Sequence, residues 1–249
     1  MSRPDKYDHI KEVIKTIFEY NKGRYGYRRI HIVLRQYGYT INHKTLQKLM
    51  KELSLQGKRK TRKYRSYRGL VGKIAPNILN RQFSAKKPYE KLVTDVTEFK
   101  ICNEKVYLSP VMDLFNHEII AHSISRRPTF DQIKDMLNKL FLRLPTTSRP
   151  LLHSDQGWQY QHKQYQRMLE QKGIIQSMSN KGNCLDNAVM ENFFGILKSE
   201  LLYLQEFDSM EHFKDELIEY LNYYNNRRSK AKLKGLPPAL HRQQALSVT

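Results

Sequence analysis

The hydrophobic pattern of the chain changes near residue 89, and this change decides its fold class. Three runs of apolar and β-branched residues follow, at 92–101, 105–115 and 118–125, with short polar turns between them. Helical and strand-like patterns then alternate to about residue 225, which gives the order β-β-β-α-β-α-β-α-α. We therefore expect residues 89–249 to form an α/β domain with a mixed five-stranded sheet and flanking helices.

The remaining elements of this domain follow from shorter patterns. A fourth strand begins at residue 151, and a fifth covers 174–178. On the long helix that comes next, Val189, Phe193 and Ile196 are expected to face the hydrophobic core. The helices are expected at residues 129–143, 161–172, 185–203 and 209–225.

Residues 1–56 carry three stripes of apolar residues at helical spacing and are predicted to form a small, basic, all-α domain. Gly38 can end the second helix and Asn42 can cap the third, so two short helices meet at a tight turn, as in a helix-turn-helix unit. An ordinary three-helix bundle with basic solvent faces has the same periodicity and stays an alternative. The third helix has residues off its apolar stripe that suit a DNA groove, namely His43, Lys44, Gln47, Lys48 and Lys51.

Most of the positive charge lies in the first third of the chain. Of the formal net charge of +20, residues 1–91 hold +18, from 24 lysines and arginines against six acidic residues. Residues 92–249 hold +2, from 20 basic residues against 18 acidic ones. This asymmetry indicates a polyanionic partner, and we expect a nucleic acid. A basic surface that only aids solubility is the alternative.

Residues 57–88 are expected to be a basic arm or linker, poorly ordered to about residue 88. Seven of the twelve residues at 57–68 are basic, and like charge at this density opposes a compact core. Tyr64 and Tyr67 lie among them and can stack on bases while the cations neutralise phosphates. The basic residues are Lys58, Arg59, Lys60, Arg62, Lys63, Arg65 and Arg68.

Several classes of protein do not fit this sequence. The two cysteines, Cys102 and Cys184, lack the spacing of a zinc site or a disulfide framework, which favours a reducing, cytoplasmic environment. No apolar run approaches the roughly 20 residues of a membrane helix, and the N-terminus has no signal-peptide core. Neither a phosphate-binding Gly-Lys-Ser/Thr loop nor a dinucleotide fingerprint is present, so we expect no use of ATP or NAD.

Three acidic residues stand where they can bind one pair of divalent cations. Asp95 lies inside an apolar strand, where aspartate is disfavoured, and Asp155 ends a short apolar strand. Glu191 lies early on a helix, with Asn187 one turn before it and Lys198 two turns after it on the same face. Mg²⁺ prefers such oxygen ligands, and two ions about 3.5–4 Å apart can break and join phosphodiester bonds.

Each of these acids also has a simpler interpretation. Asp155 could cap the helix after it, and Glu191 could be only an ion-pair partner for Lys198. Other carboxylates compete for the site, with Asp113 the strongest because it lies in a second apolar strand. His153 is expected to be structural or to touch substrate. The competing carboxylates are Glu98, Asp113 and Asp186, and the last could cap the helix of Glu191.

The local motifs resemble the larger, OrfB-type subunit of transposases of the IS-three insertion-sequence family. That family belongs to the DDE enzymes of the retroviral-integrase superfamily. The resemblance covers essentially the whole chain and includes the spacing of the three acids. The matching stretches are Tyr-Gly-Tyr-Arg-Arg-Ile at 25–30, Thr-Asp-Val-Thr-Glu-Phe at 94–99, His-Ser-Asp-Gln-Gly at 153–157 with Tyr160, most of 177–200, Tyr-Asn-Asn-Arg at 224–227 and Leu-Pro-Pro-Ala at 236–239.

The resemblance implies an RNase H-like catalytic core with Asp95, Asp155 and Glu191 as the triad and Lys198 as an accompanying basic residue. It implies nicking at the ends of an insertion sequence and transfer of the 3′-hydroxyl to target DNA, with Mg²⁺ or Mn²⁺, as two ions. The rival hypotheses are a nuclease of the same fold that only hydrolyses, and a DNA-binding repressor without enzymatic activity.

The same resemblance sets the expected partners and location. The DNA partners are the terminal repeats of the element and the target, and the protein partners are a small first-frame product, or a fusion to it, and further copies of this chain. No leucine zipper is evident, which fits a second reading frame alone. We expect a bacterial cytoplasmic protein that associates with the nucleoid when it binds DNA.

Overall fold

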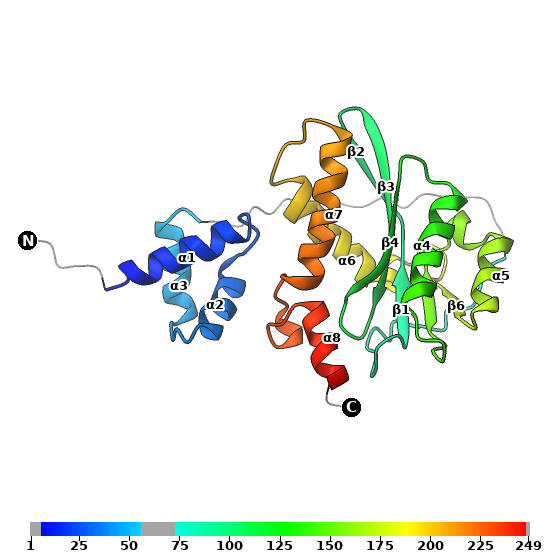
Figure 1. Ribbon diagram of the computed structural model, residues 1–249, viewed down its shortest axis with the longest axis horizontal. Helices are drawn as coiled ribbons and strands as arrows, with labels where there is room; N and C mark the ends of the chain where they lie inside the picture. The colour runs from blue at the N-terminus through cyan, green and yellow to red at the C-terminus, as the bar shows by residue number, and fades with distance from the viewer. Residues whose placement is uncertain (1–5, 56–72, 248–249) are drawn as a thin grey trace, which may run out of the picture.

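Two folded parts follow one another along the chain in the computed structural model, which describes residues 6–55 and 73–247 (Figure 1). We call residues 6–55 the N-terminal module and residues 73–247 the α/β domain. The basic residues of the expected arm lie outside the described residues, and they are Lys58, Arg59, Lys60, Arg62, Lys63, Arg65 and Arg68.

The N-terminal module consists of three helices, α1 (Asp8–Tyr20), α2 (Tyr27–Gln36) and α3 (His43–Glu52). The side chain of Asn42 accepts a hydrogen bond from the backbone N–H of Lys44 (2.8 Å), so it caps α3 as predicted. Gly38 follows α2 with a φ of +83°, a conformation that favours glycine, and this ends the helix. Most of the predicted apolar stripes are buried, including Ile14, Ile17, Ile30, Leu34, Leu46, Leu49 and Met50. Tyr37, predicted as the last residue of the second stripe, is exposed instead.

A mixed sheet forms the centre of the α/β domain. Its strands are β1 (Lys91–Thr94), β2 (Thr97–Ile101), β3 (Glu104–Asp113), β4 (Ile119–Ser125), β5 (Leu151–Ser154) and β6 (Ile175–Met178). The long strand β3 pairs antiparallel with β1 and β2 along one edge and with β4 along the other. Strand β5 runs parallel to both β1 and β6. The predicted α/β class with a mixed sheet is confirmed.

The described sheet has six strands rather than five because the strand expected at 92–101 is interrupted. The backbone N–H of Val96 donates to the carboxylate of Asp95 (2.7 Å) and does not serve the ladder at this point. Pairing with β3 resumes at Thr97 in the register that it had at Thr94. The interruption therefore frees two residues, Asp95 and Val96, from regular strand geometry without changing the register of the sheet.

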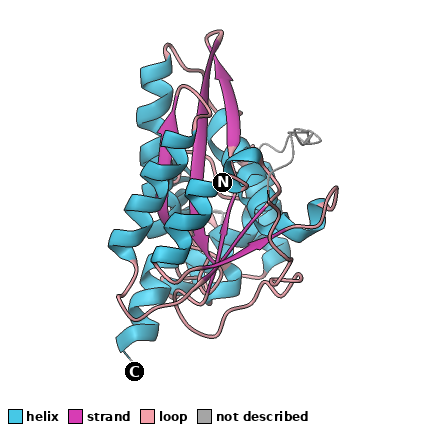
Figure 2. Cartoon of the chain, turned by 90° about the vertical axis from the view of Figure 1, so that its right-hand side faces the viewer, coloured by secondary structure: helices cyan, strands magenta, loops and turns pink. Residues whose placement is uncertain are grey.

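Helices cover both faces of the sheet. In Figure 1, α4 (Phe130–Arg143) and α5 (Lys163–Gln171) lie on one side, and α6 (Ala188–Leu197) and α7 (Met210–Asn226) lie on the other. Figure 2 shows the strands among these helices after a quarter turn. Alternate residues of β1 serve the two cores, since Leu92 packs with the α4 and α5 side and Val93 with the α6 and α7 side.

The C-terminal part differs in detail from the predicted helices. The helix expected at 185–203 is divided into a 3-10 turn (Cys184–Asn187), α6, and a π-helical turn (Lys198–Leu202). Its buried face is formed by Met190, Phe193, Phe194 and Leu197, whereas Val189 and Ile196 are only half-buried. A further helix, α8 (Pro238–Ser247), was not predicted, because it has no wide apolar stripe.

The expectation of a poorly ordered link up to residue 88 was wrong for residues 73–88. These residues contain no helix or strand, yet they are anchored on the α/β domain. The hydroxyl of Ser177 accepts hydrogen bonds from the backbone N–H groups of Ile78 (2.9 Å) and Leu79 (3.1 Å). Leu79 is fully buried, and Arg81 donates to Asp186 (2.8 Å). Charge density and composition alone did not reveal these tertiary contacts.

Candidate active site

Asp95 and Asp155 stand at the carboxyl ends of two neighbouring parallel strands. Strand β1 ends at Thr94 and β5 ends at Ser154, and their register pairs Val93 with His153. Continuing that register by two residues sets Asp95 beside Asp155. Neighbouring strands lie about 4.8 Å apart, so the two carboxylates, which are distant in sequence, become close neighbours.

The environment of the two aspartates opposes their negative charge. Asp95 is 5% exposed, and burial raises its pKa well above the usual range. The negative charges of Asp155 and Glu191 add to the rise, while the N–H of Val96 and the cation of Lys198 counteract it. Burial also raises the pKa of Asp155. A divalent cation between these groups would relieve both desolvation and mutual repulsion.

Helix α6 brings Glu191 to the same place. The side-chain amide of Asn187 donates to the backbone carbonyl of Thr94 (3.3 Å), which attaches the start of α6 to the end of β1, one residue from Asp95. Glu191 follows one helical turn later, partly buried, and burial raises its pKa. Asn187 was predicted as a site residue without a role, and its contact with Thr94 gives it one: it positions the helix.

Lys198 also lies beside the acids, at the point where α6 passes into the π-helical turn. Its ammonium group is 5.6 Å from the centre of the Phe99 ring and is half-buried. Burial lowers the pKa of Lys198, and the charges of Asp95 and Glu98 raise it again. Lys198 therefore lies at the rim of the acidic cluster, where its side chain can meet a phosphate.

The competing carboxylates are all held by partners of their own. The carboxylate of Asp113 accepts hydrogen bonds from Arg242 (2.9 Å) and from the backbone N–H groups of Tyr89 and Phe115. Asp186 accepts from Arg81 (2.8 Å), from Asn77 (3.0 Å) and from the backbone of Asn180. Glu98 is exposed and bound to Lys105 and Tyr107. Asp186 does not cap α6.

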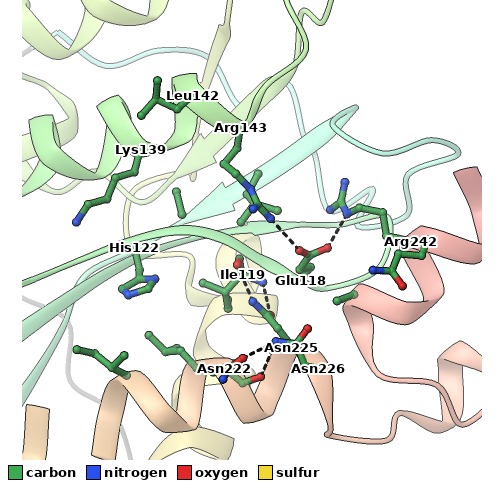
Figure 3. A pocket seen from close by; sticks show the side chains of 16 residues that line it. Glu118, Ile119, His122, Lys139, Leu142, Arg143, Asn222, Asn225, Asn226 and Arg242 are labelled. Atoms are coloured by element: carbon green, nitrogen blue, oxygen red, sulfur yellow. Dashed lines mark hydrogen bonds and ion pairs between the residues drawn. The ribbon is translucent and has the colours of Figure 1, made fainter. Parts of the chain in front are cut away.

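Glu118, another buried acid, is also held by partners of its own. Figure 3 shows Glu118 between the guanidinium groups of Arg143 and Arg242, which lie 3.4 Å and 2.5 Å from its oxygens. By contrast, Asp95, Asp155 and Glu191 form no salt bridge with any residue of the described chain. Unpaired carboxylates in partly buried positions are costly, so this cluster fits a bound cation better than a structural role.

The described residues contain no group of three or more His, Cys, Asp or Glu side chains that could hold a metal ion. Mg²⁺ does not require a complete set of protein ligands. The ion commonly binds one or two carboxylates and completes its coordination shell with water and substrate phosphate. Asp95 and Asp155 can supply that pair, and Glu191 can join from α6. The donor set, oxygen only, suits Mg²⁺ or Mn²⁺ rather than zinc.

Comparison with known proteins identifies the family. The integrase core domain model matches residues 85–184, a second integrase core domain model matches 191–246, and an HTH-like domain model matches 6–63. InsK, named as a transposase of insertion sequence element IS150 of Escherichia coli K12, is 54% identical over 244 residues, covering 98% of this chain and 86% of that protein. InsF, the transposase of insertion sequence IS3A from the same organism, is 33% identical over 233 residues, covering 92% and 81%. This chain belongs to the OrfB-type transposases of the IS3 family.

The family assignment agrees with the sheet of this transposase, since the first integrase core match begins just before β1 and includes all six strands. A solved structure of the HTLV-2 integrase catalytic core domain in complex with magnesium is 21% identical, with a TM-score of 0.48, covering 64% of this chain and 97% of that one. The fold class predicted from the motifs, an RNase H-like core after a helix-turn-helix-like domain, is confirmed.

The predicted DNA-contacting residues of the N-terminal module lie on one free helix face of the transposase. His43, Lys44, Gln47, Lys48 and Lys51 are all exposed on α3, opposite its buried stripe. This face is available to a DNA groove, as the HTH-like match leads one to expect.

His153 has a structural role in this transposase. Its ring nitrogens lie 2.9 Å from the hydroxyl of Ser177 and 3.1 Å from that of Ser179, and the side chain is fully buried. Burial lowers the pKa of His153 to about 4, so the ring is neutral at physiological pH. It ties β5, which carries Asp155, to β6.

Tyr160, which had no predicted role, lies close enough to Asp95 and Asp155 to feel the charge of both. Its side chain is fully buried, and burial together with the charges of Asp95 and Asp155 raises the pKa of its hydroxyl well above the usual range. The tyrosine therefore stays protonated beside the two aspartates. Only the tight turn after Asp155, which brings the chain back within five residues, could have indicated this.

Proposed function

We propose that this protein is a Mg²⁺-dependent DNA transposase that nicks the ends of its insertion sequence and transfers the resulting 3′-hydroxyl to target DNA. The main support is that Asp95 and Asp155 directly follow the ends of two paired, parallel strands, with the charge of Glu191 near enough to raise the pKa of Asp95. Among the described residues, no salt bridge joins any of the three acids to a cationic side chain. Membership of the IS3 transposase family supports this reaction.

The acidic cluster would hold one or two metal ions, with Asp95 and Asp155 as the main ligands and Glu191 as the third. When bound, such ions supply the positive charge that activates an attacking oxygen and stabilises a leaving oxygen. Lys198 meets a phosphate of the substrate strand at the rim of the cluster. Asn187 keeps Glu191 at the end of β1 while DNA enters.

Two phosphodiester reactions follow in this pocket. In the first, the oxygen of a water molecule forms a bond to phosphorus at the element end, and the bond to the 3′-oxygen breaks, leaving a 3′-hydroxyl. In the second, that 3′-hydroxyl oxygen forms the new bond to a target phosphate, and the target's own 3′-oxygen leaves as a hydroxyl. Both are in-line displacements, so one site can serve both.

The DNA partners would be the terminal repeats and the target. The exposed basic face of α3, centred on Lys44 and Lys48, suits a groove of the terminal repeat. The basic stretch at 57–68 suits the phosphate backbone, since its seven cations neutralise phosphates without regard to sequence. A small first-frame protein, or a fusion to it, would complete recognition of the ends, and the protein would act in the bacterial cytoplasm at the nucleoid.

Replacing Asp155 by Asn tests the proposed chemistry. The variant keeps the size of the side chain and loses its charge, so we expect nicking and strand transfer with Mg²⁺ to fall at least a thousandfold while DNA affinity stays within about twofold. The matched control is Asp131→Asn, an exposed aspartate at the start of α4, which should keep wild-type activity. Full strand transfer by Asp155→Asn refutes the assignment.

Removal of metal and choice of substrate separate the rival hypotheses. Chelation by EDTA should abolish both steps, and added Mg²⁺ or Mn²⁺ should restore them. A duplex with a preformed 3′-hydroxyl end should still be joined to target DNA, which a purely hydrolytic nuclease does not do. DNA binding that is unaffected by metal, with no cleavage under any condition, would favour the repressor hypothesis instead.

We also propose that the active form is a homo-oligomer that packs through the outer edge of β4. A cavity of about 800 Å³ lies there between α4 and α7 (Figure 3). Leu142 on α4 is 88% exposed and Ile218 on α7 is 51% exposed, so apolar side chains line both sides of a sheet edge. A second copy can cover this surface in an isologous dimer.

Leu142→Glu tests the dimer surface. The charge should shift the protein toward monomer at micromolar concentration, as measured by analytical ultracentrifugation, because a glutamate would be buried against its own symmetry copy. Leu246→Glu, an exposed leucine on α8 outside the cavity, is the control and should not change the mass. An unchanged mass for Leu142→Glu would show that this edge is not the interface.

A further inference from the structure

A buried carboxylate, Glu200, connects the N-terminal module to the helix of the active site. It lies two residues after Lys198 in the π-helical turn that continues α6, and it is 8% exposed. Its oxygens accept two hydrogen bonds from Arg228 (2.9 Å each) and one from the hydroxyl of Tyr220 (3.0 Å). These partners all belong to the α/β domain.

The remaining partner of Glu200 is Arg29, which comes from α2 of the N-terminal module. The Arg29 guanidinium donates to the Glu200 carboxylate at 2.8 Å. Burial alone would raise the pKa of Glu200, but Arg228 and Arg29 outweigh it and hold the pKa below the usual range. Glu200 therefore remains ionised between two arginines that come from different parts of the chain.

Two neighbours of Arg29 strengthen the same junction. Arg24 donates to the backbone carbonyl of Glu200 (3.0 Å), and its guanidinium lies 5.3 Å and 4.6 Å from the ring centres of Tyr220 and Tyr223. Tyr25 is almost fully buried, and its hydroxyl donates to the carbonyl of Arg227 (3.1 Å). The motif at 25–30 thus binds the region of the motif at 224–227.

Close packing of Gly235 against α2 also holds the N-terminal module on the α/β domain. A Cβ atom at Gly235 would lie 2.7 Å from the Ile32 side chain of α2, and the φ of Gly235 is +84°. The loop before α8 therefore seats closely on α2. Tyr25, Ile30 and Tyr220 belong to one continuous buried apolar cluster that spans both parts of the chain. Figure 1 shows the module on the side of α7 away from the sheet.

We propose that Arg29 and Glu200 are positioning residues, which hold DNA bound on α3 at a fixed place relative to Asp95, Asp155 and Glu191. Helix α2, which carries Arg29, packs against α3, and the helix that carries Glu200 also carries Glu191 and Lys198. The distance from an end sequence to the cut phosphate is then set by packed helices. This inference rests on the proposed function.

Arg29→Gln, with Arg28→Gln as its matched control, tests the inference in the full-length protein. Both variants remove one charge from the same turn of α2, but Arg28 is exposed and donates to the hydroxyl of Tyr27 rather than to Glu200. Two probes are compared with Mg²⁺: a duplex that carries the inverted repeat flanking the gene, and a generic duplex of equal length. The readouts are cleavage rates, positions of the cuts, DNA affinity and Tm.

Arg29→Gln should cut the inverted-repeat duplex at least tenfold more slowly, and at several neighbouring phosphates, while generic cleavage and affinity stay within about twofold of wild type. Arg29→Lys, which keeps the charge next to Glu200, should recover most of the rate and a single cut position. Arg28→Gln should cut at the wild-type position. The Arg228 pair remains in every variant, so Glu200 is not left without a partner.

Two results would overturn the inference alone. One is an unchanged ratio of end-specific to generic cleavage in Arg29→Gln. The other is an equal loss of both activities with a lowered Tm, which means that Arg29 only stabilises the fold. A wild-type protein without any metal-dependent cleavage would instead overturn the proposed function, and the inference with it.

Discussion

Glycine at position 157 allows the Asp155 carboxylate to take its place in the acidic cluster. The backbone N–H of Gly157 donates to that carboxylate (2.9 Å), and a Cβ atom there would lie 2.9 Å from the same oxygen and 2.6 Å from Gln159. The φ of Gly157 is −58°, which any residue adopts, so space rather than backbone conformation requires the glycine. Contact between the turn and the aspartate leaves no room for a methyl group.

Gly157→Ala should therefore displace Asp155 and lower the rate of Mg²⁺-dependent cleavage at least tenfold, with DNA affinity unchanged. Gly195→Ala is the control, because a side chain at that position of α6 meets open space and alanine favours a helix. Cleavage of a duplex that carries the terminal repeat measures both. Wild-type rates in Gly157→Ala would mean that the turn adapts without moving the carboxylate.

At the residue scale, sequence context singled out the candidate acids but did not separate them from carboxylates that have partners of their own. Asp95 was conspicuous because an aspartate rarely occurs inside an apolar strand, and the parallel pairing of β1 and β5 brings Asp155 to it. Asp113 has the same sequence context, but its partner Arg242 is 129 residues away in the chain. The sequence does not show which carboxylate has an arginine partner, because such partners are brought together only in the folded structure.

Asp186, just before α6, connects two segments that meet at the start of this helix. They are the loop before α6 and the anchored segment 73–88. The Asp186 carboxylate accepts hydrogen bonds from Arg81, from Asn77 and from the backbone N–H of Asn180. Burial would raise the pKa of Asp186, but these donors hold the pKa below the usual range. The element that carries Glu191 is thereby attached at its first turn, next to the Asn187 contact with β1.

Asp186→Asn should lower the free energy of unfolding by about 2 kcal/mol at pH 7, since charge-assisted hydrogen bonds are lost. The folded-state pKa lies below the unfolded value of about 3.9, so this stabilisation is present above that pH and is lost as the pH falls through the folded-state pKa. Urea unfolding at pH 7 and pH 3 measures the difference, which should be smaller at pH 3 than at pH 7. The exposed Asp131→Asn should change little at either pH. An equal loss at both pH values would contradict an ionic role.

At the element scale, periodicity predicted which segments are helices and strands but not where they are interrupted. The break between β1 and β2 comes from a side-chain acceptor at Asp95, and the change from α6 to a π-helical turn accompanies the burial of Glu200. Both interruptions lie beside the acidic cluster. Helix α8 was not predicted because it is anchored by hydrogen bonds from Arg242 to Glu118 and Asp113, and not by an apolar stripe.

At the scale of the whole molecule, charge is divided between two parts with different tasks. The net charge of +18 on residues 1–91 favours binding to DNA, whereas the nearly neutral remainder holds the acidic cluster, whose negative charge would oppose DNA in the absence of a bound cation. No helix of the described chain is long and apolar enough to cross a bilayer. The basic part is thus expected to set affinity, and the acidic cluster to set the requirement for metal.

The double variant Lys44→Gln and Lys48→Gln tests this division. Each lysine is exposed on α3, so the slope of log Kd against log salt should fall by about one per lost phosphate contact. Fluorescence anisotropy between 50 and 300 mM salt (about six values) measures the slope. A double variant of exposed lysines on α4 and α5, Lys134→Gln and Lys163→Gln, should leave it unchanged. An unaltered slope for the α3 variant would indicate that DNA binds to a surface other than α3.

The apolar cluster that spans both parts has a consequence for how the protein can move and melt. Swinging the N-terminal module away would expose Tyr25 and Tyr220 to water and leave Glu200 with one arginine fewer. The N-terminal module and the α/β domain are therefore not expected to move independently of each other. We expect a single cooperative heat-capacity peak on heating, and poor solubility for the α/β domain when it is produced without its companion.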